Sequence, residues 1–207
     1  MIPEIVICLI VGYCFGCFST GYFYGKTQNV DVRQHGSGNI GSTNTLRTLG
    51  VKAGIITLLG DVFKCLLPCA VLSILFKGKA LSYDLVVGYT GLGVVLGHNF
   101  PFWLKFKGGK GIAAMSGVII MFSLKLTLID IIVFVAIVAL TRYVSLGSLI
   151  VSLSLPIYAA IVCRGASDYI HIIIVYCMFT ILAFYKHRSN IVRLVSGTEN
   201  KIGQKAD

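Results

Sequence analysis

The amino-acid sequence predicts an all-α integral membrane protein with about seven transmembrane helices. Hydrophobic residues make up 56% of the 207 residues and charged residues only 13%, whereas a soluble domain carries about 25% charged residues. The hydrophobic residues also form long runs, and a helix that spans a bilayer needs about 20 of them. Composition and run length together favour a membrane bundle over a soluble core.

Seven apolar segments account for most of the chain. We place the spans at residues 3–25, 53–76, 84–104, 111–125, 127–142, 146–163 and 169–186. The first carries Glu4 rather than a basic start and lacks a clean cleavage site, so we interpret it as a span and not as a signal peptide. The fourth and fifth are short and could instead form one long tilted helix. No internal repeat is evident, so residues 1–207 are expected to form a single membrane domain.

The distribution of basic residues predicts the orientation. The net charge is +10, and with seven spans thirteen basic residues fall on one face against four on the other. Such an excess is typical of cytoplasmic loops, so the N-terminus is expected outside and the C-terminus in the cytoplasm. Merging the fourth and fifth spans would weaken this asymmetry. The thirteen are Lys26, Arg33, Arg47, Lys52, Lys105, Lys107, Lys110, Arg142, Lys186, Arg188, Arg193, Lys201 and Lys205, and the four are Lys77, Lys79, Lys125 and Arg164.

The basic residues and the cysteines argue against two other functions, nucleic-acid binding and metal binding. The basic residues are scattered through short loops and form no continuous stripe or known reader motif, so nucleic acid is not an expected partner. The seven cysteines all fall in apolar stretches. Cys14 and Cys17 resemble half a zinc site, but no second pair lies at a fitting spacing, so we expect buried apolar cysteines and no metal.

The first polar segment, HGSGNIGSTNTLRTLG, spans residues 35–50 between the first two spans. Its glycines permit positive φ, which lets successive N–H groups point into one concavity that binds phosphate or carboxylate. Arg47 adds a planar fork for an oxyanion, and Thr43 or Asn44 could cap a following helix. An ordinary solvated turn is the alternative. The candidate ligands are Ser37, Gly38, Asn39, Gly41, Thr43 and Asn44.

The second polar segment surrounds the sequence Lys107-Gly108-Gly109-Lys110-Gly111. Two lysines around paired glycines at the start of a helix repeat the anion-binding pattern of the first segment. It is not a Walker A loop. That motif needs a glycine five places before Gly109 and a Ser or Thr after Lys110, and this chain has Leu104 and Gly111 there. The alternative is a row of interfacial aromatic residues followed by lysines that reach the lipid surface.

The third polar segment follows the last span. His187, Asn190 and Arg193 share roughly one face of a continuing helix, and Glu199 follows. A basic helix lying on anionic lipid is the alternative. Ser145 belongs to a smaller polar element on the same side of the membrane.

Asp61 and Lys64 form an i, i+3 pair inside the second span. Charged residues in a span are costly and are usually paired or functional. We interpret them first as a structural ion pair and second as part of a proton or ion path.

The chemistry available on the basic face is limited by its few carboxylates, which are Asp31, Glu199 and Asp207. A magnesium-dependent phosphotransferase needs carboxylates gathered near the phosphates, and no such cluster is present. A histidine–aspartate acyltransferase motif is also missing, because the fifth residue after each histidine is not acidic. What remains is a site suited to more than one phosphate group, next to lipid.

Taken together, the three segments resemble the three motifs of the bacterial acyl-phosphate:glycerol-3-phosphate acyltransferases (PlsY type). The matching residues are Ser37 to Asn44 with Arg47, Gly97-His98 with Lys107 to Gly111, and His187, Asn190, Arg193, Leu194, Gly197 and Glu199. Their order, spacing and membrane placement agree across nearly the whole chain. Ala114 departs from the family, whose members often carry Thr there.

This resemblance implies a fatty acyl-phosphate donor, glycerol 3-phosphate as acceptor, and lysophosphatidic acid plus phosphate as products, in phospholipid biosynthesis. It implies no acyl-enzyme intermediate, no metal and no other cofactor. It also implies a multi-pass protein of the bacterial cell (inner) membrane, in contact with membrane lipid, with its active site facing the cytoplasm. Because an acyl-phosphate already has a good leaving group, the protein needs mainly to orient two anions and screen their repulsion.

On this basis we expect Lys107, Lys110, Arg47 and His187 to be catalytic. The proton of the attacking hydroxyl could pass to the acceptor's own phosphate or to His187. A transporter of a phosphorylated metabolite is the alternative, although the chain is short and shows no inverted repeat. The expected substrate-binding residues are Ser37, Gly38, Asn39, Gly41, Thr43, Asn44, Gly108, Gly109, Ser145, Asn190 and Arg193.

Overall fold

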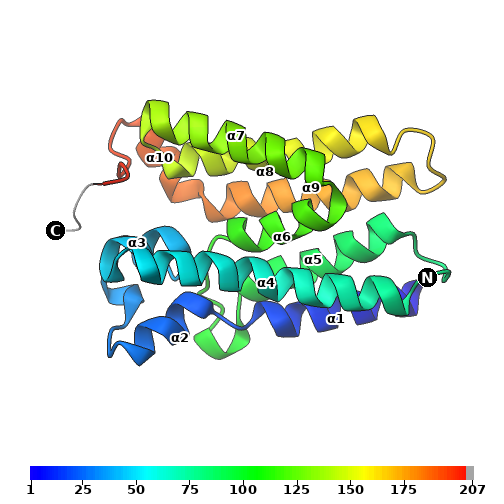
Figure 1. Ribbon diagram of the computed structural model, residues 1–207, viewed down its shortest axis with the longest axis horizontal. Coiled ribbons are helices and arrows are strands. Elements are labelled where there is room, and N and C mark those ends of the chain that lie inside the picture. The colour runs from blue at the N-terminus through cyan, green and yellow to red at the C-terminus, as the bar shows by residue number, and fades with distance from the viewer. Residues whose placement is uncertain (204–207) are drawn as a thin grey trace.

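A computed structural model describes residues 1–203, and the tail residues Lys205 and Asp207 lie outside that range. The described chain is helical throughout and contains no strand (Figure 1). The α-helices are α1 (Ile2–Gly16), α2 (Thr20–Thr27), α3 (Ser42–Leu49), α4 (Val51–Leu75), α5 (Tyr83–Asn99), α6 (Ile112–Phe122), α7 (Leu124–Thr141), α8 (Val144–Val162), α9 (Tyr169–Lys186) and α10 (Arg188–Val195), and the 3₁₀ helices are η1 (Val32–Gln34) and η2 (Phe102–Leu104).

The predicted fold class is confirmed. Within residues 1–203, six helical segments are long and apolar enough to cross a membrane, and α6 is a shorter apolar helix of 11 residues. A single helix over the fourth and fifth predicted spans does not form, because Ser123 is extended (φ −161°, ψ 115°) and its hydroxyl caps α7 by accepting from Leu126 N. That all seven segments cross the bilayer stays a prediction.

The first predicted span, 3–25, is interrupted rather than continuous. Helix α1 ends at Gly16 and α2 begins at Thr20, with Ser19 extended between them. The interruption leaves the carbonyl of Phe18 outside any helix, and Lys64 Nζ of α4 donates to it at 2.6 Å. A non-helical backbone at this depth is tolerated where such a partner satisfies the freed group.

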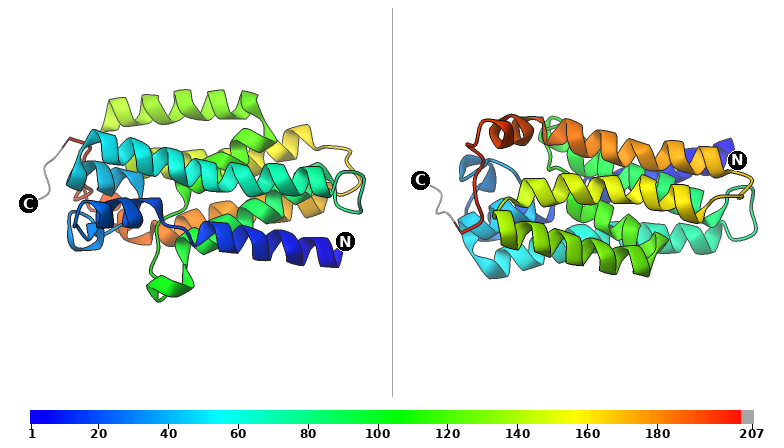
Figure 2. Two further views of the ribbon diagram at one scale, coloured as in Figure 1. Left: turned by 60° about the horizontal axis from the view of Figure 1, so that its bottom comes forward. Right: turned by 90° about the horizontal axis from the view of Figure 1, so that it is seen from above.

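The centre of the bundle is α5, which packs closely against α1. A Cβ added at Gly12 of α1 would lie 2.2 Å from Thr90 O, and one added at Gly97 of α5 would lie 2.2 Å from Tyr13 O. Only glycine allows two helices to approach this closely, which is the usual way that membrane helices associate. Helix α7, by contrast, lies at the edge of the bundle (Figure 2).

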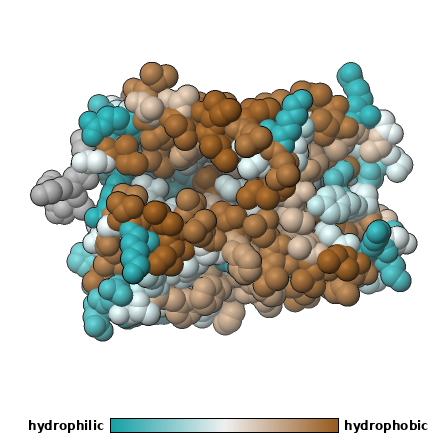
Figure 3. Space-filling view, viewed as in Figure 1, coloured by the Kyte–Doolittle hydropathy of each residue, from teal (hydrophilic) through white to brown (hydrophobic). Residues whose placement is uncertain are grey.

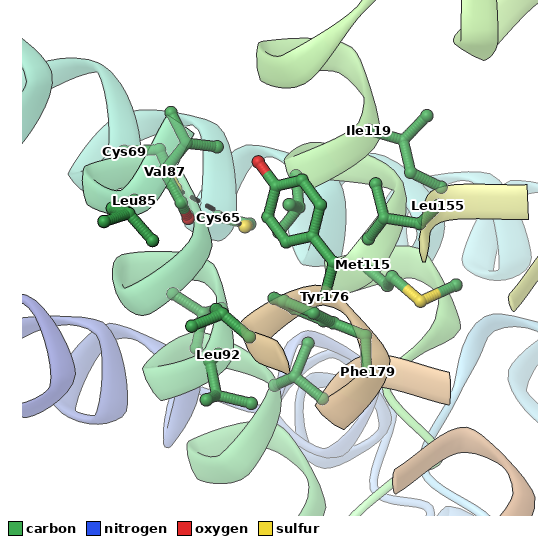
Figure 4. Close-up of a cluster of buried hydrophobic side chains, with 14 of the residues drawn as sticks. Cys65, Cys69, Leu85, Val87, Leu92, Met115, Ile119, Leu155, Tyr176 and Phe179 are labelled. Atoms are coloured by element: carbon green, nitrogen blue, oxygen red, sulfur yellow. Dashed lines mark hydrogen bonds between the residues drawn. The ribbon is translucent and has the colours of Figure 1, made fainter. Parts of the chain in front are cut away.

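The apolar core joins α5, α6, α8 and α9 through large side chains (Figure 4). Tyr176 and Phe179 of α9 are fully buried there beside Met115 of α6 and Leu155 of α8. The hydroxyl of Tyr176 donates to Asp84 O at 3.2 Å, so this buried polar group is satisfied. All seven cysteines are free thiols, and the prediction of burial holds for five of them, since Cys14 is exposed and Cys177 half-buried.

The two ends of the bundle differ. On the face that Figure 3 shows, hydrophobic residues cover most of the middle and hydrophilic residues gather toward both ends. Met1 and the last described residues lie at opposite ends, as an odd number of crossings requires (Figure 1). Helices α2, α3 and α10 gather at the end opposite Met1 and bring residues 35–50 and 187–201 together there. That this end faces the cytoplasm stays a prediction.

Candidate active site

A cavity at this end is lined by all three polar segments and by the start of α8. It encloses about 710 Å³ of empty space, its open mouth included. Helices α3, α6 and α8 each contribute residues of their first turn to its wall, and the first N–H groups of a helix have no partner within it. Three partial positive charges are therefore directed at one volume. The predicted residues that line the cavity are Ser37, Asn39, Gly41, Thr43, Asn44, Arg47, Lys110, Ser145, His187, Asn190 and Arg193.

The other four predicted site residues, Gly38, Lys107, Gly108 and Gly109, do not line this cavity. Gly108 lines a second, adjoining cavity that shares Lys110 and Asn190 with the first. Gly38 and Gly109 line neither cavity, and they shape the backbone instead, since Gly38 has φ +68° and Gly109 abuts the ring of His98.

Lys107 is the expected catalytic residue that the structure does not bring to the site. Its side chain is exposed and lines neither cavity. Lys105 and Phe106 both have left-handed backbones, with φ 53° and 60°, and the loop after α5 projects from the side of the bundle (Figure 2). The chain re-enters the protein only at Gly108 and Gly109, so Lys110 alone of this lysine pair reaches the cavity.

The first segment is folded by Asn44. Its side-chain nitrogen donates to Val32 O at 2.9 Å and to His35 O at 3.1 Å, and its Oδ1 accepts from Ser37 N at 2.7 Å. Asn44 therefore holds the loop in shape, which differs from the binding role expected of it. Neither it nor Thr43 caps α3, whose N-cap is Gly41 without a side-chain cap.

Lys110 is a half-buried cation that lines the cavity. Its Nζ donates to Asn190 Oδ1 at 2.5 Å, which joins the second segment to the third. The pKa of Lys110 is lowered to about 8, mainly by burial and also by nearby Arg193 and Arg47, while Glu199 opposes the shift. A bound dianion would favour the charged form of this lysine.

Glu199 organises the third segment. Its Oε1 accepts from Asn190 Nδ2 at 2.6 Å and from Ser145 Oγ at 2.9 Å, and its Oε2 accepts from Arg193 Nε at 2.8 Å. Burial raises its pKa, but these hydrogen bonds outweigh burial and the pKa ends below its ordinary value. An ionised Glu199 thus orients three cavity-lining side chains from α8 and α10.

His187 presents a free nitrogen to the cavity. Its Nδ1 lies 2.8 Å from Ala183 O, and a carbonyl only accepts, so Nδ1 carries the hydrogen and Nε2 is an acceptor. Burial lowers the pKa of His187 to about 4, with Lys110 adding to the effect. The ring is therefore neutral at pH 7 and suited to accept a proton or a hydrogen bond.

The predicted ion pair reaches the cavity through Asp61. Lys64 Nζ lies 2.9 Å from Asp61 Oδ1, which confirms the structural ion pair. Asp61 and His98 both line the cavity. His98 belongs to the second motif, whereas the sequence did not indicate that Asp61 reaches the site.

Comparison with known proteins identifies the family. Residues 6–197 match the sequence model described as Glycerol-3-phosphate acyltransferase. The chain belongs to the glycerol-3-phosphate acyltransferase family. It is 43% identical over 205 residues to the glycerol-3-phosphate acyltransferase of Clostridioides difficile (strain 630), with 98% of this chain and 97% of the relative covered. It is 41% identical over 203 residues to that of Thermoanaerobacter sp. (strain X514), with 98% of each covered.

A solved structure agrees with this family. The chain is similar to the crystal structure of PlsY, an integral membrane glycerol 3-phosphate acyltransferase, in its glycerol 3-phosphate form, with a TM-score of 0.83, 33% identity and 96% of each chain covered. The family expected from the three motifs is confirmed, as is the enzyme class, a membrane acyltransferase.

Lys186 was not among the site residues expected from the sequence, although it lies next to the candidate active site of this acyltransferase. Its Nζ donates to Asn99 O at 2.9 Å and to Gly108 O at 3.4 Å, and it lies 4.7 Å from the centre of the Phe100 ring. Lys186 lines the second cavity and ties α9 to the loop after α5. The one feature of the sequence that could have indicated this is that Lys186 directly precedes His187.

Proposed function

We propose that the chain transfers a fatty acyl group from an acyl-phosphate to glycerol 3-phosphate, giving lysophosphatidic acid and phosphate, at the cytoplasmic face of a bacterial cell membrane. The observation that supports this most is the convergence of Lys110, Arg47 and Arg193 with three helix N-termini around one volume. Such a volume suits two phosphoryl groups. PlsY has been solved in a glycerol 3-phosphate form and in a lysophosphatidic acid form.

We assign the acceptor to the side of the cavity formed by α3 and α10. Arg47 and Asn190 hold glycerol 3-phosphate, together with Lys110, which is bonded to Asn190. Arg193 adds charge there while Glu199 fixes its orientation. The phosphate of the donor lies against Ser37, Asn39, Gly41, Thr43 and Ser145, where the N–H groups that open α3 and α8 are directed.

The reaction is a direct transfer. The hydroxyl oxygen of glycerol 3-phosphate attacks the carbonyl carbon of the donor, a new C–O bond forms, and the bond from that carbon to the phosphate oxygen breaks. The hydroxyl proton passes to the acceptor's own phosphate, with His187 Nε2 as the competing acceptor. Lys110 and the helix N-termini stabilise the charge that develops on the carbonyl and leaving oxygens. The proposal involves no acyl-enzyme intermediate and no metal.

The acyl chain of the donor has a path to the lipid. Ile112, Ala113 and Val144 give the cavity an apolar wall beside the starts of α6 and α8. Helix α6 has only 11 residues, and a hollow opens between α7 and α4 on the face that Figure 3 shows. A lipid-soluble donor can thus place its phosphate in the cavity while its chain stays in the bilayer.

The test is an assay of purified protein in detergent with a metal chelator, with the lipid product identified by mass. We expect lysophosphatidic acid from acyl-phosphate and none from acyl-CoA. Product formed no faster than in a heat-killed sample would contradict the proposal. Accumulation of unchanged glycerol 3-phosphate inside sealed proteoliposomes, without lipid product, would instead support a transporter.

A further inference from the structure

The ammonium group of Lys64 is fully satisfied in the described chain. It lies 2.9 Å from Asp61 Oδ1, 2.6 Å from Phe18 O and 2.8 Å from His98 Nδ1. An ammonium has three hydrogens to donate and cannot accept, so these partners use all three. Both charged side chains are buried, Lys64 at 5% and Asp61 at 1% exposure.

This arrangement fixes the chemical form of His98. Because Lys64 can only donate, Nδ1 of His98 must present its lone pair, and the ring hydrogen must be on Nε2. If the His98 ring were protonated on both nitrogens, its Nδ1–H would face the ammonium of Lys64, and neither group could accept a hydrogen bond. The pair of Lys64 and Asp61 therefore holds His98 as the neutral Nε2–H form.

His98 in turn contacts the loop that carries Lys110. A Cβ added at Gly109 would lie 2.0 Å from His98 Nε2, so the ring occupies the space that any side chain at 109 would need. The carbonyl of His98 accepts from Gly109 N at 3.0 Å, and that of Asn99 accepts from Gly108 N at 3.2 Å. Ring and backbone together hold the glycine pair directly before Lys110.

Asp61 connects this network to the interrupted first span. Its Oδ1 also accepts from Thr20 Oγ1 of α2 at 3.1 Å, while Lys64 holds the carbonyl of Phe18 at the end of α1. The break between α1 and α2 is thus stabilised by the same ion pair whose Asp61 lines the cavity.

We propose that Asp61 and Lys64 are positioning residues for acyl transfer. They fix His98 in its Nε2–H form beside the cavity, so that its ring and backbone hold Gly108 and Gly109 and thereby place Lys110. The activity readout rests on the proposed function, whereas the form of the His98 ring is measured independently of it. A merely structural ion pair would stabilise the fold without determining that form.

The first measurement is the ¹⁵N spectrum of histidine-labelled wild-type protein in lipid nanodiscs, with the His98 signals assigned by their loss in His98→Gln. We expect an unprotonated Nδ1 and a protonated Nε2 at pH 7. A proton on Nδ1 would overturn the proposal whether or not any variant folds. Wild-type protein that shows the expected ring form but no transfer from acyl-phosphate would contradict the proposed function alone.

The second measurement uses the double variant Asp61→Asn/Lys64→Met, which removes both charges at similar volume, a change that folded proteins commonly tolerate. We expect its thermal midpoint to fall, because Phe18 O loses its donor. At a temperature where the variant is still folded, we expect the His98 signals to show mixed tautomers and kcat to fall about 100-fold through misplacement of Lys110. Asp130→Asn is the matched control, because Asp130 is a buried span carboxylate bonded to Ser154 at 2.8 Å and lines neither cavity. Wild-type kcat in the double variant, or a fall in kcat with the His98 tautomer unchanged, would overturn the proposal.

Discussion

Lys110 Nζ lies 2.5 Å from Asn190 Oδ1, although the two residues are 80 positions apart in the chain. This hydrogen bond links the loop before α6 to α10, and Asn190 continues the connection to Glu199 at 2.6 Å. Two of the three polar segments thus meet through side chains that also line the cavity. The candidate active site is built from these long-range contacts.

The two lysines that flank Gly108 and Gly109 are expected to differ sharply in importance. Lys110→Met should lower kcat/KM for acyl transfer about 100-fold or more, because it removes a half-buried cation from the cavity wall. Lys107→Met should stay near wild type, because Lys107 is exposed outside both cavities. Steady-state assays of both variants decide this, and a larger loss for Lys107→Met would contradict the assignment.

The pH dependence follows from Lys110. Its pKa is lowered to about 8, so the charged form that screens the phosphates is present below that pH and is lost above it. We therefore expect kcat/KM to fall about tenfold per pH unit above pH 8. Lys110→Arg should move this fall to higher pH, because an arginine stays protonated. A kcat/KM that rises above pH 8 would mean that the neutral amine is the active form.

Glu199 is expected to matter although it touches no substrate in the proposed reaction. Glu199→Gln removes the charge that orients Arg193 and weakens the bonds from Asn190 and Ser145. Loss of charge-assisted hydrogen bonds should lower kcat/KM about tenfold to 100-fold. Glu4→Gln is the control, because Glu4 lies at the opposite end beside the N-terminal amine. Equal effects of the two changes would exclude a specific role.

The orientation in the membrane can be tested by labelling. Single cysteines at Lys79 and at Ser196, both exposed and at opposite ends, are placed in a variant without the seven native cysteines. An impermeant maleimide added to intact cells should label Lys79→Cys and spare Ser196→Cys, because the more basic end is expected inside. The reverse pattern would place the cavity outside the cell.

The sequence predicted the helical class and the segments that form the site because both depend on local patterns. Apolar runs mark the spans whatever their neighbours, and glycine with cationic residues marks anion sites. The break after Gly16 was not predictable, since it depends on Lys64 donating to Phe18 O from another helix. The choice between Lys107 and Lys110 was not predictable either, because left-handed backbones at Lys105 and Phe106 turn the chain outward, and such backbones are uncommon outside glycine.

The role of Asn44 shows the same limit. Its amide was expected to bind substrate, as an exposed asparagine in a glycine-rich loop often would. Instead it is 2% exposed and bonded to Val32 O, His35 O and Ser37 N. Which polar side chains fold a loop and which remain for a ligand depends on where the loop closes, and that closure is a three-dimensional property.

The central claim is that three distant segments form one site for glycerol 3-phosphate. Calorimetric titration of glycerol 3-phosphate into purified protein tests it most directly, with Arg47→Ala, Lys110→Met and Asn190→Ala each representing one segment and Lys77→Ala as an exposed control at the other end. We predict one binding site that is weakened at least tenfold in each of the three variants and unchanged in Lys77→Ala. Unchanged affinity in any one of the three, or equal weakening in Lys77→Ala, would contradict the account.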